Sequence, residues 1–157
     1  MTTKYYILGI MLFFSCAVCS PSWAVLKDTN IKSTRTYLDD YGLSTLEWQL
    51  LWGSDFFASS PFKEIGSGFP KTNNMAYLAY TIDGNINKAE KLTLVLRVNN
   101  KAMARAAHEE MLKAAIVLAK KALGTALPEV ISRAIIQGNN ANIKVGNTSI
   151  KLIRADW

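Results

Sequence analysis

The sequence predicts an α+β domain in which an antiparallel sheet, built from two hairpins, is packed on one face by a long alanine-rich helix and by shorter helices. Residues 75–82 and 92–98 indicate two antiparallel strands, and the second alternates leucine or valine with other side chains. Residues 101–123 repeat alanine, methionine and leucine at steps of three and four, which predicts a helix with one buried face. A second strand pair meets at Gly146-Asn147, a dipeptide suited to a tight turn.

The first 24 residues have the layout of a secretory signal peptide. Lys4 supplies a positive charge, the run 5–19 is apolar apart from one serine, and Pro21 then breaks any helix. Ser22 and Ala24 place small residues where signal peptidase reads them, so we expect cleavage after Ala24. Because a membrane span needs about 20 apolar residues, a soluble exported product is favoured, and an uncleaved anchor is the alternative.

Cleavage after Ala24 would leave residues 25–157 as one exported domain without a disulfide, because both cysteines lie in the removed segment. Of the 157 residues, 50% are hydrophobic and 19% are charged, a composition that excludes a largely disordered chain. The net charge of +6 suits anionic lipid, wall polymers or acidic proteins in a periplasmic or secreted compartment. That compartment argues against nucleic acid as a partner, and it leaves weak contact with an anionic membrane surface as a minor expectation.

The first half of the domain is predicted to contain few regular elements. Residues 29–41 indicate a short helix that is capped by Thr29 and stopped by Gly42. Residues 44–52 fit two structures, because their start matches a helix capping box whereas the alternation of leucine and tryptophan favours a strand. Residues 53–74 lack a period and carry three glycines and two prolines, so we expect one long loop.

The long helix is predicted to have a buried stripe and a charged outer face. Glu109 lies four residues from both Arg105 and Lys113, so we expect ion pairs across the solvent face, and Gly124 ends the helix. The predicted stripe comprises Ala104, Ala107, Met111, Ala114, Leu118 and Ala122.

The C-terminal part is predicted to form a second helix and the second hairpin. The helix covers 128–137, with a proline in its first turn and a glycine after its end. A two-residue turn places Val145 opposite Thr148 and Ile143 opposite Ile150. A slip of one residue would exchange the two faces of this hairpin, so the turn and the apolar pattern support the same register.

The sequence contains no constellation typical of an enzyme, a cofactor site or a metal site. His108 is the single histidine, and we expect it on the solvent side of the long helix, without the partners of a catalytic base. One histidine without cysteines cannot supply the usual zinc ligands, and the acidic residues are too sparse for a calcium loop. Gly66 and Gly68 are too few for a dinucleotide-binding loop.

Two surfaces are expected to bind a partner. All four phenylalanines of the exported chain fall within the predicted loop, and Phe62 and Phe69 each lie beside a proline, so we expect these two to anchor a partner. Phe56 and Phe57 are instead expected to pin the loop onto the sheet. The second candidate surface is the basic side of the long helix, with a solvated helix face as the alternative interpretation, and its residues are Lys101, Arg105 and Lys113.

These observations favour a non-enzymatic, exported protein-binding domain, expected to be an accessory or adaptor of an envelope machine such as a secretion or surface-assembly system. The main alternative is a periplasmic inhibitor or immunity protein that blocks a toxin or a lytic enzyme, which predicts a single tight partner. A hydrolase acting on wall material or polysaccharide is the third hypothesis, because two carboxylates distant in the sequence can converge in space.

Overall fold

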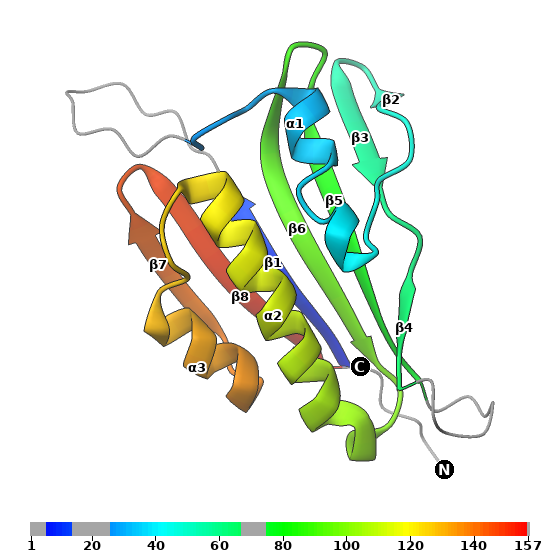
Figure 1. The fold of residues 1–157 in the computed structure, drawn as a ribbon, viewed down its shortest axis with the longest axis vertical. Helices are drawn as coiled ribbons and strands as arrows, with labels where there is room; N and C mark the ends of the chain where they lie inside the picture. Colours follow the sequence, from blue (N-terminus) through cyan, green and yellow to red (C-terminus); the bar gives the residue numbers. More distant parts are fainter. Residues whose placement is uncertain (1–5, 14–25, 67–74, 157) are drawn as a thin grey trace.

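The computed structural model describes residues 6–13, 26–66 and 75–156, which form an antiparallel sheet with helices on one face (Figure 1). The strand order is β2-β3-β5-β6-β1-β8-β7, and β4 pairs with β5. The strands are β1 (Tyr6–Phe13), β2 (Gln49–Trp52), β3 (Asp55–Ser59), β4 (Lys63–Ile65), β5 (Ala76–Asn85), β6 (Lys88–Val98), β7 (Ala141–Val145) and β8 (Thr148–Asp156). The helices are α1 (Ile31–Arg35), α2 (Ala104–Leu123) and α3 (Glu129–Gln137), with the 3-10 turns η1 (Asp39–Tyr41) and η2 (Lys101–Met103). The predicted α+β class is confirmed, and the sheet is larger than two hairpins.

The central hairpin, formed by β5 and β6, runs further than the sequence indicates. Polar residues beyond the predicted strand ends still pair, with Asp83 opposite Lys91, and the turn falls at 86–87. A bulge at Gly84 brings the Lys88 carbonyl so close that a side chain at this glycine would collide with it. The apolar face predicted for the second strand is buried, and it comprises Leu92, Leu94, Leu96 and Val98.

The helix predicted over 29–41 is two short pieces, α1 and η1. The side chain of Asn30, not that of Thr29, caps α1 by accepting two backbone N–H hydrogen bonds. At the C-terminal end of α1, Thr36 is the capping residue, and both its backbone N–H and its hydroxyl donate to the carbonyl of Ser33. Gly42, with φ 74°, ends η1 as predicted.

The prediction of a long loop over 53–74 is wrong, because β3 and β4 lie within it; residues 67–74 lie outside the described residues. These strands have five and three residues, too few to show a period, and each pairs with the edge of β5. For 44–52 the strand alternative is correct at its end, where β2 pairs with β3. Short strands of this kind depend on a neighbour that already offers a free edge.

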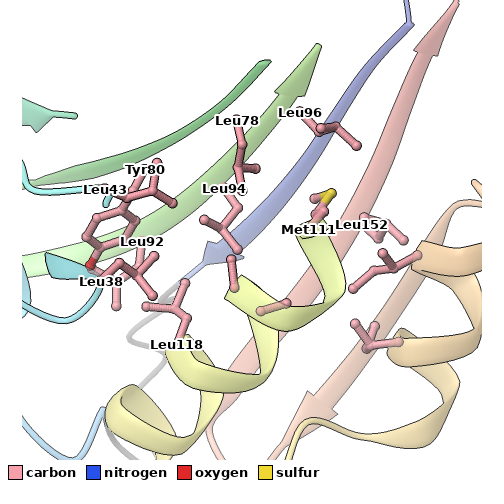
Figure 2. Close-up of a cluster of buried hydrophobic side chains, with 14 of the residues drawn as sticks. Leu38, Leu43, Leu78, Tyr80, Leu92, Leu94, Leu96, Met111, Leu118 and Leu152 are labelled. Carbon is pink, nitrogen blue, oxygen red and sulfur yellow. The ribbon is translucent and has the colours of Figure 1, made fainter. Parts of the chain in front are cut away.

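The helix layer covers the middle of the sheet, with α2 across the central strands and α3 beside it against β7 and β8 (Figure 1). The Asn100 side chain caps the entrance through η2 by accepting a hydrogen bond from the amide of Ala102. Of the predicted stripe, Ala104 is half-buried and the other five residues are buried. Figure 2 shows Leu118 and Met111 of α2 pointing toward the leucines of β6 and β8.

The C-terminal elements follow the predicted pattern. Pro128 precedes α3 and Gly138, with φ 66°, follows it. In the β7–β8 hairpin, Val145 pairs with Thr148 and Ile143 with Ile150, which confirms the predicted register. The buried members of its helix-covered face are Thr148, Ile150 and Leu152.

Strand β1 lies within the segment predicted to be a signal peptide. It runs antiparallel between β6 and β8 and separates them along most of its length. At its centre, Ile10 is the register partner of Leu94 on one side and of Leu152 on the other. Cleavage after Ala24, which stays a prediction, would therefore remove an inner strand of this sheet.

Candidate protein-binding surface

Large apolar side chains in β2 and shortly before it are exposed. Leu46, Leu50, Leu51 and Trp52 are 60%, 59%, 69% and 86% exposed, and we call these four residues the β2 apolar surface. Single exposed apolar residues are common on proteins, whereas a group of large ones within seven positions of the chain is unusual.

The position of β2 in the sheet explains this exposure. β2 is the terminal strand of the described sheet and pairs on one side with β3. Its register shifts between Leu50 and Trp52, and Gly53, with φ 58°, makes the turn that follows. All four residues of β2 are exposed, because neither a helix nor another described strand covers them. An edge strand of this kind offers both side chains and backbone groups to a partner.

The residues beneath this surface hold it in place. The Trp48 ring stacks on Phe56 of β3, with 6.0 Å between ring centroids and 19° between planes. The backbone N–H of Leu46 donates to the carbonyl of Ser59 over 2.9 Å. Phe56 and Phe57 are half-buried members of β3, so they belong to the sheet instead of pinning a loop onto it. The β2 apolar surface is thus attached to an ordered support, which lowers the entropic cost of binding.

A pocket of about 290 Å³ opens beside the β2 apolar surface. Its lining includes Leu51, Asp55, Phe56, Asp83, Glu90 and Lys91. The Lys91 ammonium lies 3.4 Å from the Asp83 carboxylate, and Glu90 accepts a hydrogen bond of 2.7 Å from the Asn85 side chain. The Lys88 ammonium lies 3.3 Å from the Glu90 carboxylate, so two of the three lining carboxylates are paired with a lysine and the carboxylate of Asp55 leaves the pocket acidic, on a chain whose net charge is +6. The pocket therefore favours a cationic group next to an apolar contact.

Of the two phenylalanines predicted to bind a partner, Phe62 is 49% exposed and Phe69 lies outside the described residues. The Phe62 ring meets Tyr77 edge-on at 6.3 Å, and the Arg97 guanidinium lies 5.2 Å from its centroid. In the strands, Tyr77 and Arg97 alternate with the residues covered by the helices, so Phe62 lies on the open face of the sheet.

The predicted basic surface lies on the opposite side of the molecule, on the helix layer. Lys101 is exposed in η2, and Arg105 pairs with Glu109 over 3.1 Å, as predicted. Lys113 pairs over 2.6 Å with Glu110 and not with Glu109, so the second predicted pair is wrong. The structure does not bring these cations together with Phe62 into one site.

Glu109 is already paired with Arg105, and Glu110 belongs to a polar cluster around Tyr41. The Tyr41 hydroxyl donates to one carboxylate oxygen of Glu110 over 2.7 Å, and Lys113 donates to the other over 2.6 Å. Lys63 of β4 donates to the Tyr41 carbonyl over 2.7 Å, and its ammonium lies 4.2 Å from the Tyr41 ring centroid. The cluster ties η1 and β4 to α2.

The charges around Tyr41 and Glu110 favour a structural hydrogen bond and not proton transfer between them. Burial, then the bond to Glu110, raises the pKa of Tyr41, so its hydroxyl stays protonated and donates. The hydrogen bond from Lys113, and then that from Tyr41, lowers the pKa of Glu110, so its carboxylate stays ionised. The hydrogen bond raises the pKa of Tyr41 and lowers the pKa of Glu110. Both pKa values therefore move away from neutral pH, whereas acid–base catalysis needs a pKa near the working pH.

His108, half-buried on α2, also has a local partner. Its Nδ1 lies 3.1 Å from the carbonyl of Ile136 on α3, so the ring connects the two helices. Within the described residues, no group of three or more histidine, cysteine or acidic side chains is arranged to hold a metal ion. Among the described helices, none has the length and apolar character needed to cross a membrane.

The β2 apolar surface was missed from the sequence, because residues 44–52 were interpreted only as a helix or a strand and not for which of their side chains would be exposed. The available signal was the run Leu50-Leu51-Trp52, which places apolar side chains on both faces of a strand immediately before a turn. Such a run belongs either to a strand buried on both faces or to a strand with a binding role. Comparison of the chain with protein-family models, with curated proteins and with solved structures found no match.

Proposed function

We propose that the chain is an exported, non-enzymatic protein-binding domain that serves as an accessory or adaptor of an envelope machine, such as a secretion or surface-assembly system. The β2 apolar surface carries this proposal. Keeping large apolar side chains in water is unfavourable, so a cluster that includes a tryptophan is typical of a surface that a partner covers.

The pocket beside the surface indicates the chemistry of the partner. Leu51 belongs both to the β2 apolar surface and to the lining of the acidic pocket, so one bound segment can contact both. We expect that segment to place an apolar side chain against Trp52 and a lysine or arginine near Asp55. Asp55→Asn should therefore weaken binding, because it removes the carboxylate that attracts the cation. It should also reduce the dependence of binding on salt, because salt screens the attraction between exposed charges.

The test is photo-crosslinking in cells from a reactive side chain placed at Ser54, in the exposed turn after β2. Partners trapped in this way are identified by mass spectrometry, and binding of the purified partner is then measured. Trp52→Ala should weaken binding about 30-fold, which corresponds to a hot-spot loss of about 2 kcal/mol. The fold should be nearly unaffected, because this side chain is 86% exposed.

Matched controls are Ile116→Ala and Ile136→Ala, which shorten exposed apolar side chains on α2 and α3. Both should leave crosslinking and affinity unchanged. An equal loss in the controls, or full binding by Trp52→Ala, would contradict the assignment of the surface. Several membrane-associated partners would support an adaptor, whereas one stoichiometric toxin or lytic enzyme would favour an inhibitor.

Export itself is tested by the intact mass of the protein recovered outside the cytoplasm. Cleavage after Ala24 predicts a chain that begins at Val25. A chain that retains Met1 in the membrane fraction would contradict the soluble exported form.

A further inference from the structure

The place of β1 in the sheet is defined by both of its neighbours. β1 pairs antiparallel with β6 from Tyr6 to Leu12 and with β8 from Tyr6 to Phe13. Because β6 and β8 are each antiparallel to β1, they run parallel to one another and are separated by one strand. β5 pairs with the far side of β6, and β7 pairs with the far side of β8.

The helix layer connects β6 and β8 independently of β1. Leu94 of β6, Leu118 of α2 and Ile150 of β8 line the same small apolar pocket under α2. All three belong to one buried cluster, so α2 is packed against both sides of β1 at once. Bringing β6 and β8 into direct contact would require the β7–β8 hairpin to move by one strand spacing, about 4.8 Å, and would break this packing.

Removal of the predicted signal peptide therefore has a structural consequence. Without β1, the facing edges of β6 and β8 present backbone N–H and C=O groups beneath the helix layer. Strand edges with unpaired backbone groups pair readily with another strand, so these two edges favour an added strand.

We propose that, in the exported protein, the place of β1 is a slot that binds an extended segment of a partner protein, antiparallel to both β6 and β8. This inference rests on the proposed export and identifies a second, deeper contact of the same adaptor. Binding by an added strand takes its affinity from main-chain hydrogen bonds and its specificity from alternate side chains.

The neighbouring residues define the side chains that the segment needs. Every second position of the slot lies in register with a buried residue of β6 under the helices, such as Leu94. Two of these positions are also in register with the buried Ile150 and Leu152 of β8. Apolar side chains are required at these positions, because they complete the core. The positions between them lie in register with residues of the open face, among them Thr93.

Thr93 makes one of these open-face positions specific. It is 5% exposed, and its hydroxyl finds no hydrogen-bond partner among the described residues. A polar side chain at the register position opposite Thr93, which Met11 occupies in β1, would supply that partner. The slot therefore fits an alternating segment with a serine, threonine or asparagine at this point.

The experiment uses the exported protein after natural processing, with its N-terminus established by intact mass. The probe is a peptide with the sequence of β1, YILGIMLF, flanked by lysines for solubility. The control peptide carries proline at the places of Leu8 and Met11, which removes one N–H from each side of the strand. A third peptide carries serine at the place of Met11. Binding is followed by amide hydrogen exchange and by thermal unfolding.

We expect the β1 peptide to slow exchange at least tenfold along 92–98 and 149–156, and to raise Tm in proportion to the logarithm of its concentration. The proline peptide should do neither, and the serine peptide should bind more tightly than the parent. Amides along both edges that are already protected without peptide would overturn the proposal, because they would show β6 paired directly with β8. A strand-exchanged dimer of the exported protein, or equal binding by the proline peptide, would also overturn it.

The outcomes separate this inference from the proposed function. A closed slot with crosslinking at Ser54 that still depends on Trp52 refutes the slot and leaves the adaptor function standing. A chain that retains residues 1–24 refutes the slot through the failure of export, because β1 then fills it permanently. Strand binding without any Trp52-dependent partner supports the slot and refutes the function assigned to the β2 apolar surface.

Discussion

Truncation of Leu118 to alanine tests the packing of α2 against the sheet. Leu118 is 2% exposed and lies where α2 meets Leu94 and Ile150. The substitution removes three carbon atoms, which lowers the free energy of unfolding by about 2.4 kcal/mol at about 0.8 kcal/mol for each buried methylene. A small apolar pocket already lies beside this side chain, so the neighbours are not expected to close the new space. A residual cavity of roughly 50 Å³ adds about 1 kcal/mol.

The total loss should be about 3–4 kcal/mol, within the usual range for buried leucine truncations. For a chain of this size, this corresponds to a fall in Tm of roughly 6–16 °C. Urea unfolding, followed by circular dichroism, measures the change directly, and the denaturant slope should stay constant because the surface exposed on unfolding is unchanged.

The matched control is Ile116→Ala, on the same helix and with a side chain of the same size. Ile116 is 46% exposed, so its truncation should lower the free energy of unfolding by less than about 1 kcal/mol. Equal losses at the two positions would refute the reasoning, because they would mean that α2 does not turn its alanine-rich face toward the sheet.

Three further predictions concern polar contacts, partner binding and metal independence. Because the pKa of Glu110 is lowered in the folded protein, its stabilising effect is present above about pH 4.3 and is lost as the pH falls through the lowered pKa. Glu110→Gln should therefore flatten the fall in the urea midpoint below about pH 5, and an unchanged slope would contradict the contact with Tyr41 and Lys113. Phe62→Ala should weaken crosslinking to the partner while it shifts Tm by a few degrees at most, because Phe62 is 49% exposed. If the variant unfolds readily and its folded fraction still binds normally, the ring has a packing role instead. For a chain that begins at Val25 and so lacks both cysteines, chelator and reductant should leave the Tm unchanged, and a fall of several degrees with chelator would indicate an oxygen-ligand metal site.

Local rules in the sequence were sufficient for the C-terminal half of the fold. The turn at Gly146-Asn147 determines the register of β7 and β8, because a two-residue connection leaves one way to pair the strands that follow from it. The stripe of α2 is equally local, since its period depends on the geometry of a helix and not on the partner that it covers. Gly124 and Gly138 end their helices in the left-handed conformation that glycine adopts readily.

The pairing of short strands was decided by tertiary structure. β3 and β4 form because β5 offers them a hydrogen-bonding edge. Strands of five and three residues are too short for their own sequence to predict this pairing. Lys113 pairs with Glu110, a carboxylate that also accepts from Tyr41, which is distant in the sequence, while Glu109 pairs with Arg105. An ion pair on a helix has several partners within reach, and a third group selects among them.

The candidate site shows the same division. The sequence by itself determined that this chain forms a helix-covered antiparallel sheet, whereas the export-like character of its N-terminal segment stays a prediction. Tertiary structure decided that the apolar residues of β2 remain outside the core and that the apolar segment of β1 lies in the middle of the sheet. The physical reason is that the sequence shows which side chains are apolar and favour burial. Whether such a side chain is covered depends on strands and helices from other parts of the chain.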